Sequence, residues 1–252
     1  MSQRIDPDEQ SRKMEKAALR GEPSYVWRAG QVRRFEMIVA SAGERIHGAI
    51  LEDGCGVGMY MKQFLRGSDD VYGLEFDPER AKDASLISPR VLNGAGEWLP
   101  YPDNSFDLLL SHEVLEHVVD DRKCATEMVR VLKTGGRAMI FVPNRGYPFE
   151  THGIYWRGKY YFGNKPFVNY LPRTLRDALA PHVKVYSGRE VRALFEGQPC
   201  QIVEHRVIFG AYDNIIARFG GLGKLLRAGL QALESTPLSG LGLSHYLVVE
   251  KL

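Results

Sequence analysis

The chain reads Ile50-Leu51-Glu52-Asp53-Gly54-Cys55-Gly56-Val57-Gly58 at the point that decides its fold. An apolar run ends on a carboxylate, three alternating glycines follow, and a helix-compatible run begins at Met59. Glycines let the backbone turn tightly and let a ligand approach, because no Cβ is in the way. A helix that follows such a loop presents unpaired N–H groups and the positive end of its dipole. The pattern predicts a strand, a ligand-binding loop and a helix.

The spacing of the glycines narrows the choice of ligand. The dinucleotide-binding fingerprint requires its third glycine where Met59 stands, and the Gly-Lys-Ser/Thr ending of a phosphate-binding loop is absent. The pattern Glu-x-Gly-x-Gly-x-Gly resembles motif I of the class I S-adenosylmethionine (SAM) methyltransferases. The resemblance implies that the cofactor contacts five residues of this stretch: Glu52, Gly54, Cys55, Gly56 and Gly58.

A second predicted strand, Val71–Glu75, also ends on a carboxylate. In doubly wound folds an acid about 20 residues past the glycine loop hydrogen-bonds ribose hydroxyls, and a carboxylate can accept from two hydroxyls at once. Glu75 is therefore the predicted ribose ligand. Phe76 lies either against the adenine face or in a structural contact. Asp77-Pro78 is typical of a helix start.

Four further motifs follow in order. Residues 93–101 and 103–107 resemble the Asp-Ala-Glu-x-Leu-Pro-Phe and Asp-Asn-Ser-Phe-Asp signatures of the type 11 methyltransferase family. Residues 111–118 and 131–144 resemble the family's segments after the fourth strand and around the fifth. The close resemblance covers positions 45–145. It implies that the chain binds SAM and transfers its methyl group.

One position departs from the family pattern. The family often has Asp, which binds the adenine amino group, where this chain has Ala95. Backbone groups near Ala95 and Gly96, or a neighbouring side chain, must then take that part. Ser111, at the end of the fourth predicted strand, and Tyr25, in the N-terminal segment, complete the predicted cofactor contacts.

Length and composition agree with one soluble α/β domain. The chain has 252 residues, 44% of them hydrophobic and 25% charged, and a net charge of +2, which gives no electrostatic case for nucleic-acid binding. Cys55, Cys124 and Cys200 are widely spaced and odd in number, which favours a reducing compartment over a disulfide framework or a zinc site. Residues 1–15 lack the apolar core of a signal peptide. We expect a cytoplasmic protein.

Alternating apolar runs and helical patterns predict parallel β-α-β units. We expect an N-terminal helical cap over 1–47, in two pieces broken near Gly21-Glu22-Pro23, and a SAM-binding domain over 48–252. Helices are also expected at 172–180 and 189–196. The fold class is a doubly wound α/β fold whose seven-stranded, mostly parallel sheet has an antiparallel last strand. The strands are expected near 49–52, 71–75, 90–93, 106–111, 137–142, 200–208 and 245–250.

The segment 144–172 is long for a connection, which favours a functional lid over a linker. Aromatic residues alternate in it with arginines and lysines. Such a segment could stack single-stranded bases, hold an apolar or aromatic acceptor that carries an anionic group, or form a local satellite core. We expect a lid over the substrate.

A hydroxyl acceptor needs a base, and histidine exchanges a proton near neutral pH. We expect His152 to be that base and His117 to be the next candidate; the others are His112, Glu113, Glu116 and Glu150. Glu113-x-x-Glu116-His117 resembles a segment of quinone-biosynthesis O-methyltransferases that can hold a divalent cation, whereas in many type 11 relatives the histidine only caps or packs. We expect no metal; if one is used, magnesium at these three residues is the candidate.

Residues 213–233 form an apolar helical stretch with basic residues and several glycines. It either packs on the sheet or rests on a membrane surface. The predicted function is methyl transfer from SAM to oxygen or carbon of a small-molecule acceptor such as a quinone, a lipid or a natural product. The alternatives are a SAM-binding protein of this fold without turnover, which acts as an interaction partner, and an RNA or protein methyltransferase. The oligomeric state stays open.

Overall fold

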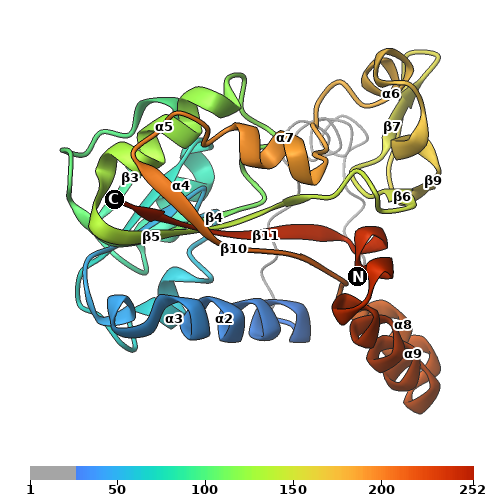
Figure 1. Cartoon of the computed structure of the whole chain (residues 1–252), viewed down its shortest axis with the longest axis horizontal. Helices are drawn as coiled ribbons and strands as arrows, with labels where there is room; N and C mark the ends of the chain where they lie inside the picture. Colours follow the sequence, from blue (N-terminus) through green and yellow to red (C-terminus); the bar gives the residue numbers. More distant parts are fainter. Residues whose placement is uncertain (1–26) are drawn as a thin grey trace, which may run out of the picture.

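The computed structural model describes residues 27–252, and its centre is a seven-stranded sheet in the order β10-β11-β5-β4-β1-β2-β3 (Figure 1). Neighbouring strands among β1 to β5 run parallel, whereas β11 runs antiparallel to both β5 and β10. This confirms the predicted doubly wound sheet with an antiparallel last strand. The strands are β1 (Ile50–Asp53), β2 (Val71–Glu75), β3 (Val91–Asn93), β4 (Phe106–His112), β5 (Leu132–Pro143), β10 (Cys200–Ile208) and β11 (Ser244–Lys251).

Strand β5 begins earlier than its sequence pattern predicts, at Leu132 rather than near residue 137. Leu132 pairs with Phe106, and the register shifts before Leu108 pairs with Arg137. Gly135, with φ +79°, lies within this irregularity. The expected start near residue 137 left Gly135 and Gly136 outside the strand, but they form a bulge within a continuous strand.

Helices cover both faces of the sheet (Figure 1). Side chains of successive strand residues alternate between two apolar clusters, since Ile50 belongs to one and Leu51 to the other. The cluster of Ile50 includes residues of α2 (Ala29–Ala42), α3 (Met61–Phe64) and α4 (Pro78–Ser85). The cluster of Leu51 includes residues of α5 (Asp121–Val131) and α7 (Gly188–Ala193). After α2 the chain continues into η1 (Gly43–His47), so residues 29–47 are helical. The first piece of the expected helical segment and the break near Gly21-Glu22-Pro23 lie outside the described residues.

The segment after β5 folds into short paired strands next to α6 (Arg173–Leu179) (Figure 1). Asn169 is buried, and its Nδ2 donates to the carbonyl oxygens of Tyr147 and Phe149 at 3.2 and 3.0 Å. The segment is therefore an ordered unit and not an extended linker. Its elements are β6 (Phe149–Glu150), which pairs with β9 (Lys165–Pro166); the hairpin of β7 (Ile154–Trp156) and β8 (Lys159–Tyr161); and η3 (Val168–Tyr170).

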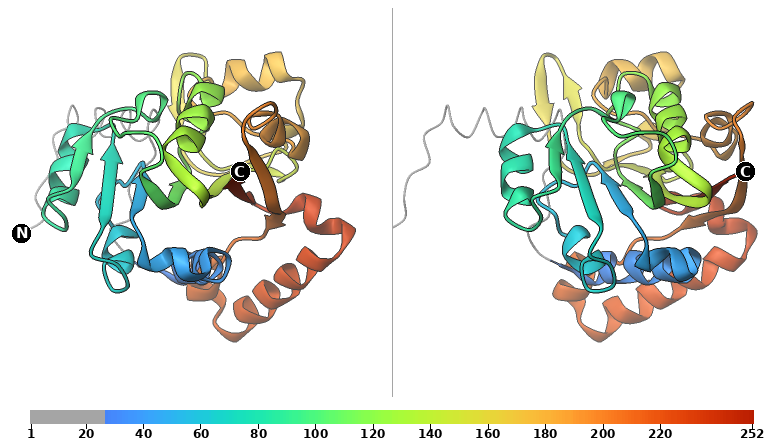
Figure 2. Two further views of the ribbon diagram at one scale, coloured as in Figure 1. Left: turned by 60° about the vertical axis from the view of Figure 1, so that its left-hand side comes forward. Right: turned by 90° about the vertical axis from the view of Figure 1, so that its left-hand side faces the viewer.

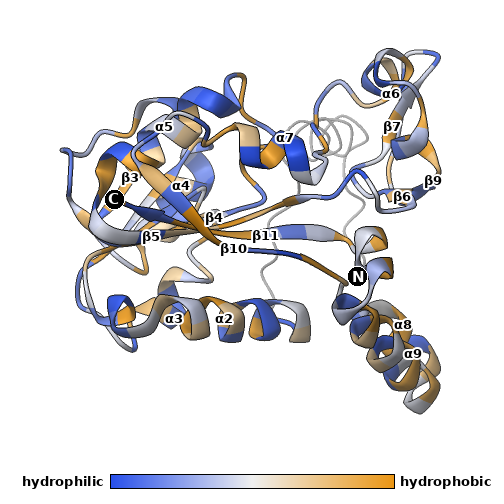
Figure 3. Cartoon of the chain, viewed as in Figure 1, coloured by the Kyte–Doolittle hydropathy of each residue, from blue (hydrophilic) through white to orange (hydrophobic). Residues whose placement is uncertain are grey.

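Residues 213–233 form two helices, α8 (Asp213–Phe219) and α9 (Gly221–Ala232), joined at Gly220, whose φ is +53°. The helices approach closely because a Cβ on Gly223 would lie 2.8 Å from the carbonyl oxygen of Ile215. Every residue of α9 is described, and Gly223 is the one that is buried. The hairpin stands off from the sheet (Figure 2, left view), and hydrophobic and hydrophilic residues alternate along it (Figure 3). Of the two alternatives for this stretch, a helix packed on the sheet is therefore not what the structure shows.

Two short helices, η4 (Leu233–Ser235) and η5 (Pro237–Leu241), return the chain from this hairpin to β11. Within residues 27–252, no helix is long and apolar enough to span a lipid bilayer.

Candidate functional site

A cavity of about 700 Å³ opens where β1, β2 and β4 end. In open α/β sheets, ligands bind outside the carboxyl ends of the strands, and the motifs of the sequence predict a site at the same edge. Five segments line the cavity: the glycine loop, the end of β2, the loop after β3, the loop after β4, and the lid. They contribute residues within 52–60, 74–80, 94–97, 112–119 and 151–162, together with Gln31 from α2.

Most of the predicted cofactor residues line this cavity. Gly58 and Ser111 do not line it. A Cβ on Gly58, whose φ is +79°, would lie 2.8 Å from Ile87 Cδ1, so this glycine fits the loop against the residues after α4. Ser111 is fully buried within β4. Tyr25 lies outside the described residues. The cavity brings together Glu52, Gly54, Cys55, Gly56, Glu75, Phe76, Ala95 and Gly96.

Glu75 ties the glycine loop to the start of α4. The Gly56 amide donates to one of its carboxylate oxygens at 2.9 Å, and the Asp77 amide donates to the other at 2.8 Å. Asp77 in turn caps α4, because its Oδ1 accepts from the Glu79 amide at 2.9 Å. Each oxygen of Glu75 keeps a further lone pair. This carboxylate can therefore hold the loop and still accept a hydroxyl of a ligand.

Glu52 presents a buried oxygen at the cavity. Among the residues described, its Oε2 finds no hydrogen-bond partner. Burial, with a further contribution from the negative charge of Glu75, raises the pKa of Glu52 well above its ordinary value. A buried polar atom without a partner is unusual in a native protein. A cationic or hydrogen-bond-donating group of a ligand would satisfy it.

Close contacts restrict two glycines of the site. A Cβ on Gly54 would lie 2.3 Å from Val114 Cγ2, and one on Gly96 would lie 3.0 Å from both carboxylate oxygens of Asp53. Asp53, which the motif analysis passed over, lines the cavity, and burial raises its pKa to about 7. The site thus offers carboxylates, tight glycines and the exposed ring of Phe76. This donor set fits the ammonium, hydroxyl and adenine groups of SAM.

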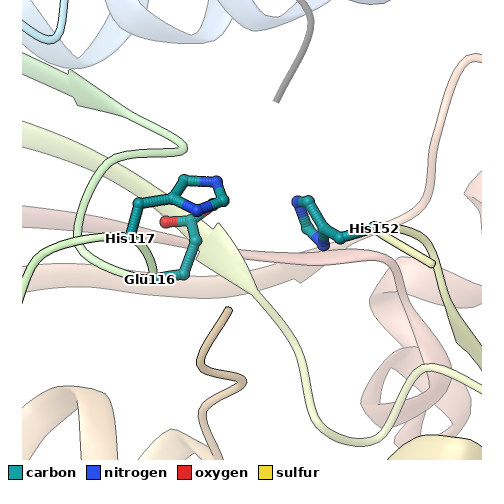
Figure 4. Close-up of side chains that lie close together, drawn as sticks. All are labelled: Glu116, His117 and His152. Carbon is teal, nitrogen blue, oxygen red and sulfur yellow. The ribbon is translucent and has the colours of Figure 1, made fainter. Parts of the chain in front are cut away.

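The far end of the cavity holds two imidazoles. His117 follows β4 and His152 belongs to the lid, yet their ring centroids lie 5.4 Å apart at an interplanar angle of 80°. Figure 4 shows the two rings pointing toward one another, with the Glu116 carboxylate beside His117. One potential ligand atom from each of these three residues lies within 4.8 Å of the other two. No local pattern in the sequence places position 152 next to position 117.

In both imidazoles, a hydrogen bond at Nδ1 orients the ring. Nδ1 of His117 lies 3.3 Å from the carbonyl oxygen of His182, and Nδ1 of His152 lies 3.1 Å from Glu150 Oε1. A carbonyl only accepts, so Nδ1 of His117 must donate, and Nε2 then keeps its lone pair. The same holds for His152, because its acceptor is ionised. Against the effect of burial, hydrogen bonds from the side chain and backbone of His152 and the charge of Arg176 lower the pKa of Glu150 to about 2.

Arg176 completes this arrangement from α6. Its Nη2 donates to Glu150 Oε2 at 2.6 Å, and both side chains are buried. Burial and the neighbouring His152 lower the pKa of His117 to about 4. His117 is therefore a neutral imidazole at physiological pH.

Arg34 of α2 contacts His112 and Glu113, which also line the cavity. It donates to Nε2 of His112 at 2.6 Å, and its Nη2 lies 3.4 Å from Glu113 Oε1. Burial and then Arg34 lower the pKa of His112 to about 3. Against the effect of burial, Arg34 and His112 lower the pKa of Glu113 to about 2. Sequence reasoning missed Arg34, because this residue lies outside every motif.

Glu116 lies deeper, behind the histidines. Only 1% of it is exposed, and as a carboxylate it has no donor within reach among the described residues. Burial and the adjacent Glu113 raise the pKa of Glu116 above its ordinary value. In its protonated form it can donate to Glu113.

Comparison with known proteins relates the central part of this chain to a family. The methyltransferase-domain family matches residues 51–140. A probable S-adenosylmethionine-dependent methyltransferase of Mycolicibacterium smegmatis is 33% identical over 116 residues, which cover 45% of each chain. A demethylmenaquinone methyltransferase of Renibacterium salmoninarum is 28% identical over 175 residues, which cover 65% of this chain and 68% of that protein. The match spans less than half the length of the first of these relatives.

The fold is shared with solved structures. An S-adenosylmethionine-dependent methyltransferase from Mesorhizobium loti superposes with a TM-score of 0.62 at 17% identity and covers 86% of this chain and 97% of its own. The YcgJ protein of Bacillus subtilis gives a TM-score of 0.56 at 20% identity and covers 87% of this chain and 98% of its own. Residues 51–140 of this chain therefore match the methyltransferase-domain family, and the chain has the fold of the class I S-adenosylmethionine-dependent methyltransferases.

Proposed function

We propose that this protein transfers a methyl group from SAM to oxygen or carbon of a small-molecule acceptor. The observation that carries the proposal is one cavity with two different ends. At one end lie the glycine loop, Glu52 and Glu75, and at the other lie His117 and His152. Bound SAM supplies a methyl group on a positively charged sulfur. Much of the catalysis then comes from alignment and from the exclusion of water.

At the cofactor end, each group has a partner that suits its chemistry. Glu75 accepts the ribose hydroxyls while it holds the glycine loop, and the unsatisfied oxygen of Glu52 accepts from the ammonium group. The adenine lies against the exposed ring of Phe76. Its amino group is bound by the backbone near Ala95 and Gly96, which line the cavity where the family often carries an aspartate.

At the acceptor end, His152 takes the proton from the acceptor, with His117 as the second candidate. Glu150 holds the ring of His152 with its Nε2 lone pair free, and Arg176 holds Glu150. A base that is oriented by a buried third group is the arrangement that proton abstraction requires. The orientation of its ring by Glu150 therefore supports His152 as the base.

The lid indicates the acceptor class. Thr151, Tyr160 and Phe162 line the cavity from the lid, so an acceptor would contact aromatic rings on its way to His152. A quinone, a lipid or an aromatic natural product fits such a wall. The Renibacterium relative acts, by its name, on demethylmenaquinone, which is one member of this class.

The hairpin of α8 and α9 suggests where such an acceptor is found. Leu222 and Leu225 are 68% and 70% exposed, and they lie on the same side of α9 as Leu226. Arg218 and Lys224 are exposed beside them. An apolar stripe flanked by basic residues suits the surface of an anionic membrane. We infer that the protein works in the cytoplasm, at such a surface.

Binding and transfer can be tested separately. Calorimetry should show that S-adenosylhomocysteine binds more tightly than NAD, and labelled SAM should transfer its methyl group to a demethylated quinone or a related phenol. Tighter binding of NAD would refute the assignment of the cofactor. Binding of S-adenosylhomocysteine without transfer to any member of an acceptor panel would favour the SAM-binding protein without turnover.

A further inference from the structure

We propose that Glu116, His117 and His152 form a binding site for one divalent transition-metal ion of the zinc type. The site lies at the acceptor end of the cavity. With the ion bound, the Nε2 lone pair of His152 is occupied, so the ion would take over from His152 as base and polarise the acceptor oxygen. That part rests on the proposed function, whereas the binding of the ion does not.

The distances fit a site that closes around its ion. One donor atom from each residue lies within 4.8 Å of the other two. Zinc bonds of about 2.0–2.2 Å place tetrahedral ligands roughly 3.3 Å apart, so the donors must approach by about 1 Å or more. His152 lies between β6 and β7, outside the sheet, whereas Glu116 and His117 follow β4. Closure therefore requires a movement of the lid and none of the sheet.

The hydrogen bonds around the histidines are those of metal ligands. Each imidazole donates from Nδ1, to the carbonyl of His182 or to the Glu150 carboxylate, and each leaves Nε2 free to bind. Ligating histidines almost always donate their other ring N–H to a carboxylate or a carbonyl, which fixes the tautomer. The second partner is itself fixed, because Arg176 donates to Glu150 at 2.6 Å.

The third ligand needs a positive partner. Glu116 is buried, and within residues 27–252 no donor reaches either of its carboxylate oxygens. Protonation would let Glu116 donate to Glu113, but in its ionised form, without a cation or a donor, a buried carboxylate is strongly unfavourable. The guanidinium of Arg34 is already engaged by His112 and Glu113, and that of Arg176 by Glu150. A divalent ion between Glu116 and the two imidazoles would resolve this imbalance.

The donor set selects the metal. Two imidazole nitrogens and one carboxylate oxygen suit zinc, cobalt and nickel, whereas magnesium and calcium prefer oxygen ligands throughout. The inference therefore differs in both ligands and ion from a magnesium site at Glu113, Glu116 and His117. Three protein ligands leave a zinc ion with an open position. His117 and His152 line the cavity, so that position faces an oxygen of the acceptor.

The experiment measures metal binding directly. Protein freed of metal by a chelator is titrated with Co²⁺, followed by its visible absorption, and then with Zn²⁺ in competition with a chromophoric chelator. We expect one equivalent to bind and millimolar Mg²⁺ to leave it in place. H117A, H152A and E116Q should each weaken Zn²⁺ binding at least 100-fold. E150Q should weaken it roughly 10-fold, because it only positions His152. The control is H47A, a substitution of an exposed histidine far from the site.

Two results would overturn the proposal: wild-type Zn²⁺ affinity in both H117A and H152A, or displacement of Co²⁺ by an equal concentration of Mg²⁺. Binding of S-adenosylhomocysteine and the melting temperature report folding for every variant. E116Q, which preserves the shape of the side chain, gives the decisive comparison if the alanine variants unfold. Zn²⁺ binding without S-adenosylhomocysteine binding would refute the proposed function alone, and the reverse would refute the metal site alone.

Discussion

Replacing Glu75 by glutamine tests the cofactor end of the site with the smallest change in shape. The two carboxylate oxygens of Glu75 accept from the backbone amides of Gly56 and Asp77 at 2.9 and 2.8 Å. In Glu75→Gln one of those oxygens becomes an NH₂ group. In either orientation of the amide, its NH₂ group faces one of these two backbone N–H groups, which is then left without an acceptor.

The magnitude follows from these two bonds. A hydrogen bond to a charged group contributes about 1.5–3 kcal/mol, and an unsatisfied buried donor costs about 1–3 kcal/mol. For a chain of this length a loss of 1 kcal/mol lowers the melting temperature by about 2–4 °C, so we expect a decrease of roughly 3–8 °C. S-adenosylhomocysteine should bind roughly 5–150-fold more weakly, which corresponds to about 1–3 kcal/mol of lost ribose hydrogen bonding.

Calorimetry and thermal unfolding measure the two effects in parallel. Glu36→Gln, the same substitution at an exposed position of α2, is the control and should change neither quantity. A variant that binds S-adenosylhomocysteine within twofold of the wild type but melts earlier would show that Glu75 holds the loop and does not bind the ribose. Unchanged affinity and unchanged stability together would refute both roles.

Three further outcomes are expected. His152→Ala should leave S-adenosylhomocysteine affinity within twofold and lower methyl transfer by about 10²–10⁴-fold; wild-type turnover would eliminate His152. Burial and Arg34 keep the pKa of His112 at about 3, so the unfolded chain takes up a proton below pH 6.5 that the folded protein does not. The free energy of unfolding should therefore fall between pH 7.5 and 5. Measured by urea unfolding, this fall should be roughly 1–2 kcal/mol smaller in His112→Gln than in the wild type; an equal fall in both would contradict the reasoning. Anionic vesicles should sediment the wild type but not a Leu222→Glu, Leu225→Glu variant, and equal sedimentation would remove the membrane role of the hairpin.

The sequence pattern predicted those elements of the fold that neighbouring residues in the chain determine. β2 coincides with its predicted range, because an apolar run between polar residues defines a strand by itself. The glycine loop could also be predicted, since a Cβ at Gly54 meets Val114 at 2.3 Å and any other residue would be excluded. The start of β5 could not be predicted from the sequence, because the bulge at Gly135 depends on pairing with the neighbouring strand β4.

The acceptor end of the site depends on tertiary structure. Arg34 reaches His112 across 78 positions, and His152 reaches His117 only because the lid folds back over the end of β4. Neither contact has a spacing that a helix or a strand would impose. Sequence patterns could nominate the histidines individually. They could not show that two of them share one end of a cavity with Glu116.

The buried pair of Glu150 and Arg176 links the lid to α6 within one stretch of chain. The cofactor end, in contrast, is built from the edge of the sheet. The two ends of the cavity can therefore diverge at different rates. Duplicated copies of this protein could exchange residues 144–185 and acquire a new acceptor, while the sheet edge keeps the same methyl donor. Comparison among relatives should locate acceptor preference in that stretch, and a chimera that carries it should inherit the preference of its source.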